Sequence, residues 1–93
     1  MLNVMADSVH NQIKRTSVEL LIADLELGLT FLDVADTSIN EQTIRRNSRN
    51  GRNVYDTALR LLPRLTLNKE ERQTIEDKLA TLKKRLAAVG EPI

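Results

Sequence analysis

The stretch Gly51-Arg-Asn-Val-Tyr-Asp-Thr-Ala-Leu-Arg-Leu-Leu-Pro63 decides the fold of this 93-residue chain. Within it Gly51, Tyr55, Ala58 and Leu62 recur every three or four residues, which is the spacing of one face of an α-helix. Pro63 ends the pattern, because proline removes a backbone hydrogen bond and clashes with the preceding turn. Small residues on an otherwise apolar face predict close contact with a second helix. The stretch therefore indicates an all-α fold, and it brings no catalytic chemistry with it.

Helical spacing also fills the sequence before this stretch and predicts a first helix over residues 8–36. One stripe of this helix consists of Leu21, Leu25, Gly28, Leu32 and Ala35, and a second stripe consists of Leu20, Leu27, Phe31 and Val34. Val9 and Ile13 continue the second stripe towards the N-terminus. Together the two stripes predict an amphipathic helix with an unusually wide apolar face.

The second and third helices are predicted over residues 39–65 and 69–89. Ser38 and Glu41 have the spacing of a capping box at the start of the second helix, and Asn68 is placed to cap the third. Short connections make neighbouring helices antiparallel, so we expect an up-down-up three-helix bundle without strands. The predicted core consists of Leu21, Leu25, Leu32, Ile44, Tyr55, Ala58, Leu62, Ile75, Leu79, Leu82 and Leu86.

Composition narrows the class of protein. The hydrophobic fraction of 41% and the charged fraction of 29% are typical of a globular chain, and the length suits a single domain over residues 1–93 with a flexible tail at residues 1–7. A net charge of +1 gives no global attraction to nucleic acid or to anionic membranes. No apolar run approaches the ~20 residues of a membrane span, and the N-terminus lacks the basic leader of a signal peptide. We therefore expect a cytoplasmic protein without a membrane partner.

A family resemblance rests on two short motifs. Tyr55-x-x-Ala58-Leu59-x-Leu61-x-Pro63 resembles the second helix of a tetratricopeptide repeat, and Leu27-Gly28-x-x-Phe31 resembles the first. A single such hairpin closed by a third helix is more similar to the microtubule-interacting-and-trafficking class of three-helix modules. That resemblance implies a protein that binds a partner helix or tail in a groove between helices.

Asp24 is the one acidic residue placed within the apolar face of the first helix. A buried carboxylate is costly unless it is paired and hydrogen-bonded. We therefore predict a structural buried bond from Asp24 to Tyr55, or to Arg49 or Arg52, on the second helix. The alternative is that Asp24 is a polar anchor inside a groove that receives a ligand or a partner.

The second helix carries the one local concentration of positive charge. Arg45, Arg49 and Arg52 share a face through their spacing of four and three residues. Asp56 lies four residues after Arg52, which favours ordinary ion pairing on a solvated face. Docking of an acidic partner and contact with nucleic-acid phosphates are the two functional alternatives. Aromatic residues make up 2% of the chain, so few side chains could stack on single-stranded bases, which argues against nucleic acid as a partner.

The sequence offers no catalytic or cofactor chemistry. It has no cysteine and one histidine, His10, so neither a thiolate nucleophile nor a His or Cys metal site is predicted. Asn47 and Ser48 face inward beside Gly51 but have no base within the pattern. We therefore expect a protein that is not an enzyme, with no metal, no cofactor and no small-molecule substrate.

Surplus apolar surface on the first helix predicts self-association or docking. Ile22 and Leu29 lie at the edge of its wide apolar face, and leftover apolar surface in a small bundle usually meets a partner. We expect a small protein-interaction module that docks a partner helix or tail, or itself as a homodimer. The alternative is a nucleic-acid-binding accessory protein that uses Arg45, Arg49 and Arg52.

Overall fold

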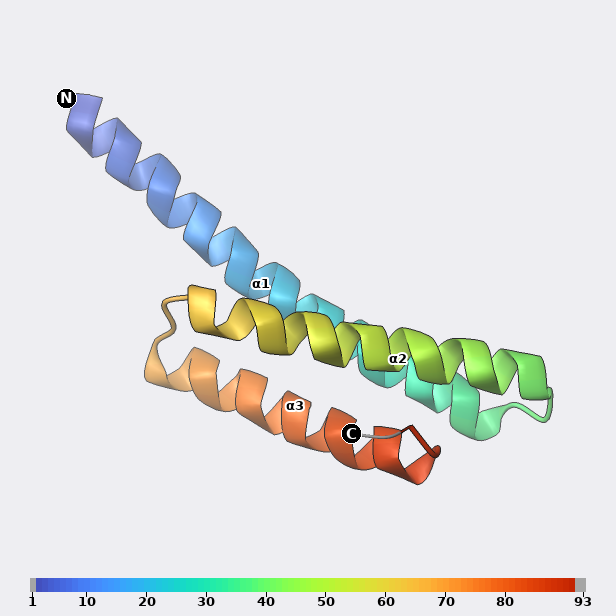
Figure 1. Ribbon diagram of the computed structural model, residues 1–93. Helices are drawn as coiled ribbons and strands as arrows, with labels where there is room; N and C mark the ends of the chain where they lie inside the picture. The colour runs from blue at the N-terminus through green and yellow to red at the C-terminus, as the bar shows by residue number, and fades with distance from the viewer. Residues whose placement is uncertain (1, 92–93) are drawn as a thin grey trace.

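The computed structural model is an all-α bundle of three helices and describes the backbone of residues 2–91 and the side chains of residues 17–91. Helix α1 spans Leu2–Thr37, α2 spans Glu41–Leu61 and α3 spans Lys69–Ala88, with a short 3-10 helix, η1, over Leu62–Arg64. Each helix packs on the other two in the predicted up-down-up order (Figure 1). No strand occurs within residues 2–91.

The core lies along the line where the three helices meet. Its buried side chains are Val18, Leu21, Leu25, Leu32, Tyr55, Ala58, Ile75, Leu79, Leu82 and Leu86. This confirms nine members of the predicted core, while Ile44 and Leu62 are only half-buried. On α3 the buried residues follow alternating steps of four and three, as expected for a helix that fits between two others.

Two glycines set the distance between α1 and α2. A Cβ atom placed on Gly51 would lie 3.5 Å from the backbone oxygen of Gly28 and 2.9 Å from Leu32 Cδ2. A Cβ atom on Gly28 would lie 2.9 Å from Val54 Cγ1. The two helices therefore cross where neither has a side chain, as the small residues of the sequence predicted.

The start of α2 differs from the prediction. Ser38 does not form a capping box with Glu41, because the helix begins two residues later than expected. Asn40 caps it instead: its side-chain oxygen accepts a hydrogen bond of 3.0 Å from the Thr43 amide. Ser38 Oγ accepts one of 3.2 Å from the Asn40 amide and so shapes the turn.

The ends of α2 and α3 follow the local chemistry of the sequence. Pro63 lies inside η1, so the regular helix ends at Leu61 and not at residue 65. Asn68 and Glu71 form a reciprocal capping box at the start of α3. At the other end Gly90 has φ +87°, and the Gly90 and Glu91 amides donate to the Ala87 and Leu86 carbonyls. This is the Schellman motif, which favours glycine at that position.

Helix α1 is much longer than its neighbours and starts earlier than predicted. It has 36 residues, against 21 in α2 and 20 in α3, and it begins at Leu2 and not at residue 8. Its N-terminal half projects past the ends of the other two helices (Figure 1), which gives the molecule extents of 59 × 21 × 17 Å. The side chains of Val9, His10 and Ile13 and the predicted tail at residues 1–7 lie outside the described side chains, so those predictions stay predictions.

Candidate docking surface on α1

The second apolar stripe of α1 does not enter the core. Leu20, Leu27 and Val34 are exposed by 58%, 48% and 41%, and Phe31 is half-buried. These four residues are here called the outer stripe. Each of them precedes a core residue or Gly28 by one position, and one position corresponds to a rotation of about 100° around the helix. The outer stripe therefore lies on a separate face of α1, turned away from the core.

A shallow groove between α1 and α2 borders the outer stripe. Two adjoining hollows form it, of about 260 Å³ and 230 Å³, and both include Leu21 and Asp24. The larger hollow is lined by Ser17, Leu20, Leu21, Asp24, Leu61, Arg64 and Leu65. None of the lining residues belongs to α3, so the groove lies on the side of the α1–α2 pair that α3 does not line.

Asp24 lies in this groove and is exposed, so the prediction of a buried Asp24 bonded to α2 is wrong. It makes no hydrogen bond or ion pair with another described side chain. Asp24 was predicted to lie among leucines because the two stripes of α1 were interpreted as one wide apolar face. Since only one stripe packs inward, Asp24 falls on the line of the outer stripe, where its charge stays hydrated. The alternative prediction, a polar anchor inside a groove that receives a ligand or a partner, stays a prediction.

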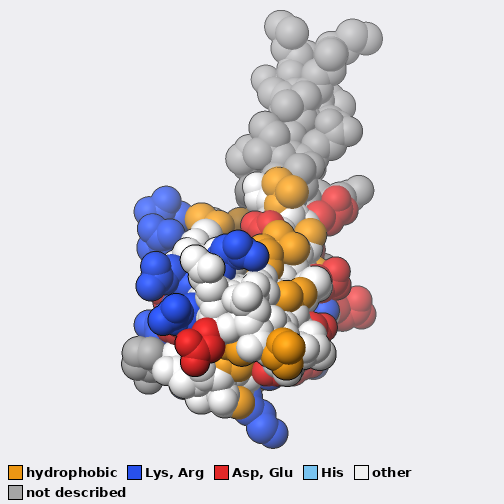
Figure 2. Space-filling view, turned by 90° about the vertical axis from the view of Figure 1, so that its right-hand side faces the viewer, with side chains coloured by type: hydrophobic (Ala, Val, Ile, Leu, Met, Phe, Trp, Pro, Cys, Tyr) orange, Lys and Arg blue, Asp and Glu red, His pale blue; other side chains and the backbone are white. Residues whose placement is uncertain are grey.

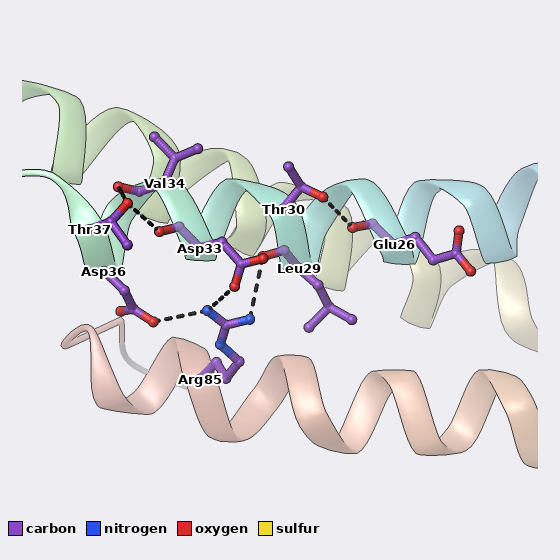
Figure 3. Close-up of polar contacts among 8 residues, drawn as sticks. All are labelled: Glu26, Leu29, Thr30, Asp33, Val34, Asp36, Thr37 and Arg85. Carbon is purple, nitrogen blue, oxygen red and sulfur yellow. Dashed lines mark hydrogen bonds and ion pairs between the residues drawn. The ribbon is translucent and has the colours of Figure 1, made fainter.

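Ile22 and Leu29 are not the surplus apolar surface that the sequence predicted. Both are half-buried and pack against the core. Figure 3 shows the Leu29 side chain pointing towards α3, whereas Val34 and Thr30 point away from it. The apolar surface left open on α1 is therefore the outer stripe and not the edge formed by Ile22 and Leu29.

A group of charges that was not predicted from the sequence joins α1 to α3. Arg85 Nη2 contacts Asp33 Oδ1 at 2.6 Å and Asp36 Oδ2 at 2.9 Å (Figure 3). Lys78 Nζ lies 3.2 Å from Glu26 Oε1. Glu26 and Asp33 are seven residues apart, and so are Lys78 and Arg85. From this matched spacing on two parallel helices, the ion pairs between α1 and α3 could have been predicted.

Arg85 also balances charge at the end of α1. Asp33 and Asp36 lie in the last two turns, where the helix dipole disfavours acidic groups. The hydrogen bond to Asp36, followed by that to Asp33, raises the pKa of Arg85 above its ordinary value. The Arg85 guanidinium therefore stays charged throughout the pH range in which proteins are folded. Its contact with Asp33 and Asp36 holds α3 against one side of α1.

The arginines of α2 divide into paired and unpaired groups. Arg52 Nε bonds both carboxylate oxygens of Asp56 at 3.0 and 3.1 Å, as the spacing predicted. Arg45 and Arg49 are exposed and make no ion pair with the described residues; with Arg46 they line a shallow hollow. On the face drawn in Figure 2, most of the Lys and Arg side chains lie at the left and most of the Asp and Glu side chains at the right, with exposed hydrophobic side chains between them.

The inward polar residues of α2 lie where the sequence placed them. Tyr55, Asn47 and Ser48 are all buried. Asn47 Nδ2 donates to the Thr43 carbonyl at 2.9 Å, and the Ser48 hydroxyl has no hydrogen-bond partner among the described residues. None of the three faces the groove, so they contribute to the helix crossing and not to the candidate surface.

Two further observations concern the described residues only. No three of their His, Cys, Asp or Glu side chains come together in an arrangement that would hold a metal ion. None of the helices is both long enough and apolar enough to cross a membrane.

Comparison with protein-family models, with curated proteins and with solved structures finds no match to this chain. The resemblance to tetratricopeptide and microtubule-interacting-and-trafficking modules therefore rests on the residues alone.

Proposed function

We propose that this protein is a non-enzymatic interaction module that docks a helix on the outer stripe of α1. The observation that carries the proposal is the exposure of Leu20, Leu27 and Val34 along one line of the helix. Their spacing of seven residues is that of a coiled-coil seam. Exposed apolar residues scattered singly need no explanation, but several of them aligned on one helix face of a small protein favour an interaction site.

The neighbouring groove supports a helix as the docked element. Leu61 and Leu65 supply a second apolar wall opposite Leu20, while Asp24 and Arg64 supply one charge of each sign. A helix laid along this groove would bury the apolar wall and meet both charges, which is how amphipathic helices bind in interhelical grooves. No cofactor and no small-molecule substrate enter the proposal.

Site-specific photocrosslinking in the native cell tests this function. A photoreactive amino acid at Leu27 should yield a discrete crosslink to a polypeptide, and Leu20→Glu in the same chain should abolish that crosslink. Leu59 is the matched control, since it is 45% exposed on α2 and lies outside the groove. Absence of any crosslink from Leu27, or equal crosslinking from Leu59, would contradict the proposal.

The free arginines favour a second candidate, a nucleic-acid accessory role. Arg45, Arg46 and Arg49 are exposed and unpaired among the described residues, so they are available to phosphate oxygens. Three phosphate contacts would make log K fall with log salt at a slope of about −2 to −3. A titration of duplex DNA and of single-stranded RNA at several salt concentrations measures this slope. Undetectable binding at ~50 mM salt would remove the candidate.

A further inference from the structure

We infer that the outer stripe of α1 binds a second copy of this chain in antiparallel orientation. In that pairing the projecting N-terminal half of one α1 covers the outer stripe of the other. The inference rests on the proposed function and names the helix that docks. Four observations support it, and all of them concern α1.

The first observation is the continuity of the apolar line. Counting from Leu20 towards the N-terminus, apolar residues follow at steps of seven, four and seven: Ile13, Val9 and Leu2. The backbone is helical over this whole length, starting at Leu2. In steps of seven and four residues, the sequence of the projecting half therefore continues the apolar line of the outer stripe on the same helix face, so one helix provides both halves of a seam.

The second observation is a match of lengths. From Leu20 to Val34 the outer stripe rises through 14 residues, or about 21 Å. The projecting half, residues 2–16, has 15 residues and a length of about 22 Å. We place the two antiparallel α1 helices so that the numbers of residues lying level with each other sum to about 36. Leu2 of one copy then lies level with Val34 of the other, and Val9 lies level with Leu27. The two-fold axis then passes near Val18, as an isologous interface requires.

The third observation is that this register keeps the two bundles apart. In each copy α2 and α3 pack beside the second half of α1, and its first half projects past their ends (Figure 1). Reversing the second copy about Val18 puts its bundle beside the projecting half of the first. Each bundle thereby gains a fourth helix from the other copy. A parallel pairing would instead bring both bundles to the same end and leave both projections together at the other.

The fourth observation is charge complementarity. Residues 17–37 of α1 contain five acidic residues and no basic one: Glu19, Asp24, Glu26, Asp33 and Asp36. The projecting half contains Lys14 and Arg15 against Asp7, which gives it a net charge of +1. Antiparallel pairing sets Lys14 within one turn of Asp24 of the second copy and Arg15 within one turn of Glu19. Parallel pairing would set each acidic residue level with itself, which is repulsive.

Cysteine pairing tests the register, since the chain contains no cysteine of its own. Val9→Cys and Leu27→Cys chains, mixed and mildly oxidised, should form a disulfide-linked heterodimer in high yield. Either variant alone should stay mostly reduced, because two copies of the same position lie about 27 Å apart along the seam. The control is a mixture of Val9→Cys with Leu59→Cys, which should give no more than the background of random collisions. Linked Val9→Cys homodimers in place of the mixed product would overturn the antiparallel register.

A charge exchange tests the same pairing without cysteine. Lys14→Glu should raise the dimer dissociation constant roughly 5- to 50-fold, as expected for the loss of a close pair across an interface. Adding Asp24→Lys should restore most of the affinity, because the opposite charges then face each other again. Unchanged dissociation constants in both variants would contradict the pairing.

The outcome also separates this inference from the proposed function. A purified chain that stays monomeric at about 100 µM, together with a Leu27 crosslink to a different polypeptide in the cell, rejects the second copy and keeps the docking function. A monomer without any Leu27 crosslink rejects both. A crosslink between two copies of this chain, together with the mixed disulfide, supports both.

Discussion

Gly28 and Gly51 act at the closest point of the α1–α2 crossing, but they do not tolerate a methyl group equally. On Gly28 a Cβ would meet Val54 Cγ1 at 2.9 Å and Val54 Cβ at 3.2 Å. Valine is stiff at χ1, so neither atom can yield easily. On Gly51 the nearest atom is the far end of Leu32, a side chain with more freedom to turn.

We therefore predict that Gly28→Ala destabilises the fold more than Gly51→Ala does. Overpacking costs about 1–3 kcal/mol, and the better helix propensity of alanine returns up to about 1 kcal/mol in both variants. Chemical denaturation of the two variants beside the wild type measures the difference. A Gly28→Ala protein as stable as the wild type would mean that the helices cross less closely than described.

Ser48 presents the opposite case, a buried polar atom without a partner. Its side chain is 3% exposed and its hydroxyl makes no hydrogen bond to a described residue. Ser48→Ala removes the unsatisfied group and improves helix propensity, so we predict a gain in unfolding free energy of about 1 kcal/mol. Thermal denaturation of Ser48→Ala measures it. A loss of stability would show that the hydroxyl is satisfied in solution.

At the scale of the helices, the contact of Arg85 with Asp33 and Asp36 holds α3 against α1. The Asp33 and Asp36 side chains are 66% and 50% exposed, so solvent screening limits what each ion pair contributes to the unfolding free energy. We predict that Arg85→Met lowers the unfolding free energy by about 1 kcal/mol at low salt. Screening at about 1 M NaCl should remove much of that difference. Lys83→Met is the control, because Lys83 is exposed and makes no ion pair among the described residues.

The same contact gives no pH dependence near neutrality. The folded-state pKa of Arg85 is raised, so its contribution is fully present below the unfolded-state pKa and is lost only as pH rises through the folded value. Both pKa values lie far above the neutral range. Denaturation midpoints of wild type and Arg85→Met should therefore differ by the same amount at pH 7 and pH 9. A difference that shrinks between those values would require another titrating group.

The helices themselves were predictable because their signals are local. Heptad spacing on α3, the Asn68 capping box and Pro63 each act within a few residues, and the structure has all three in place. What local signals could not decide is whether the second stripe of α1 packs inward as well as the first. Both stripes have helical spacing, and the choice depends on where Gly28 meets Gly51, a contact between distant segments. For that one reason Asp24 was predicted to be buried, and the surplus apolar surface was assigned to Ile22 and Leu29 instead of the outer stripe.

At the scale of the whole molecule, α1 has more apolar surface and more length than a three-helix bundle uses. The bundle is complete from Ser17 onwards, with capped helices and a buried core. The projecting half and the outer stripe are what remain. They match in length, in the helix face that carries their apolar residues and in charge. A four-helix arrangement in each half of a two-fold dimer would use both.

Sedimentation equilibrium of the purified chain tests this account most directly. At about 100 µM, well above the dissociation constants of ordinary specific complexes, the wild type should have twice the monomer mass of 10.5 kDa. Leu27→Glu should sediment as a monomer with its bundle still folded, since the loss of a central contact weakens binding by at least about 30-fold. Leu59→Glu, altered at an equally exposed leucine outside the seam, should remain dimeric. A monomeric wild type, or equal masses for the two glutamate variants, would contradict the pairing of α1 with a second copy.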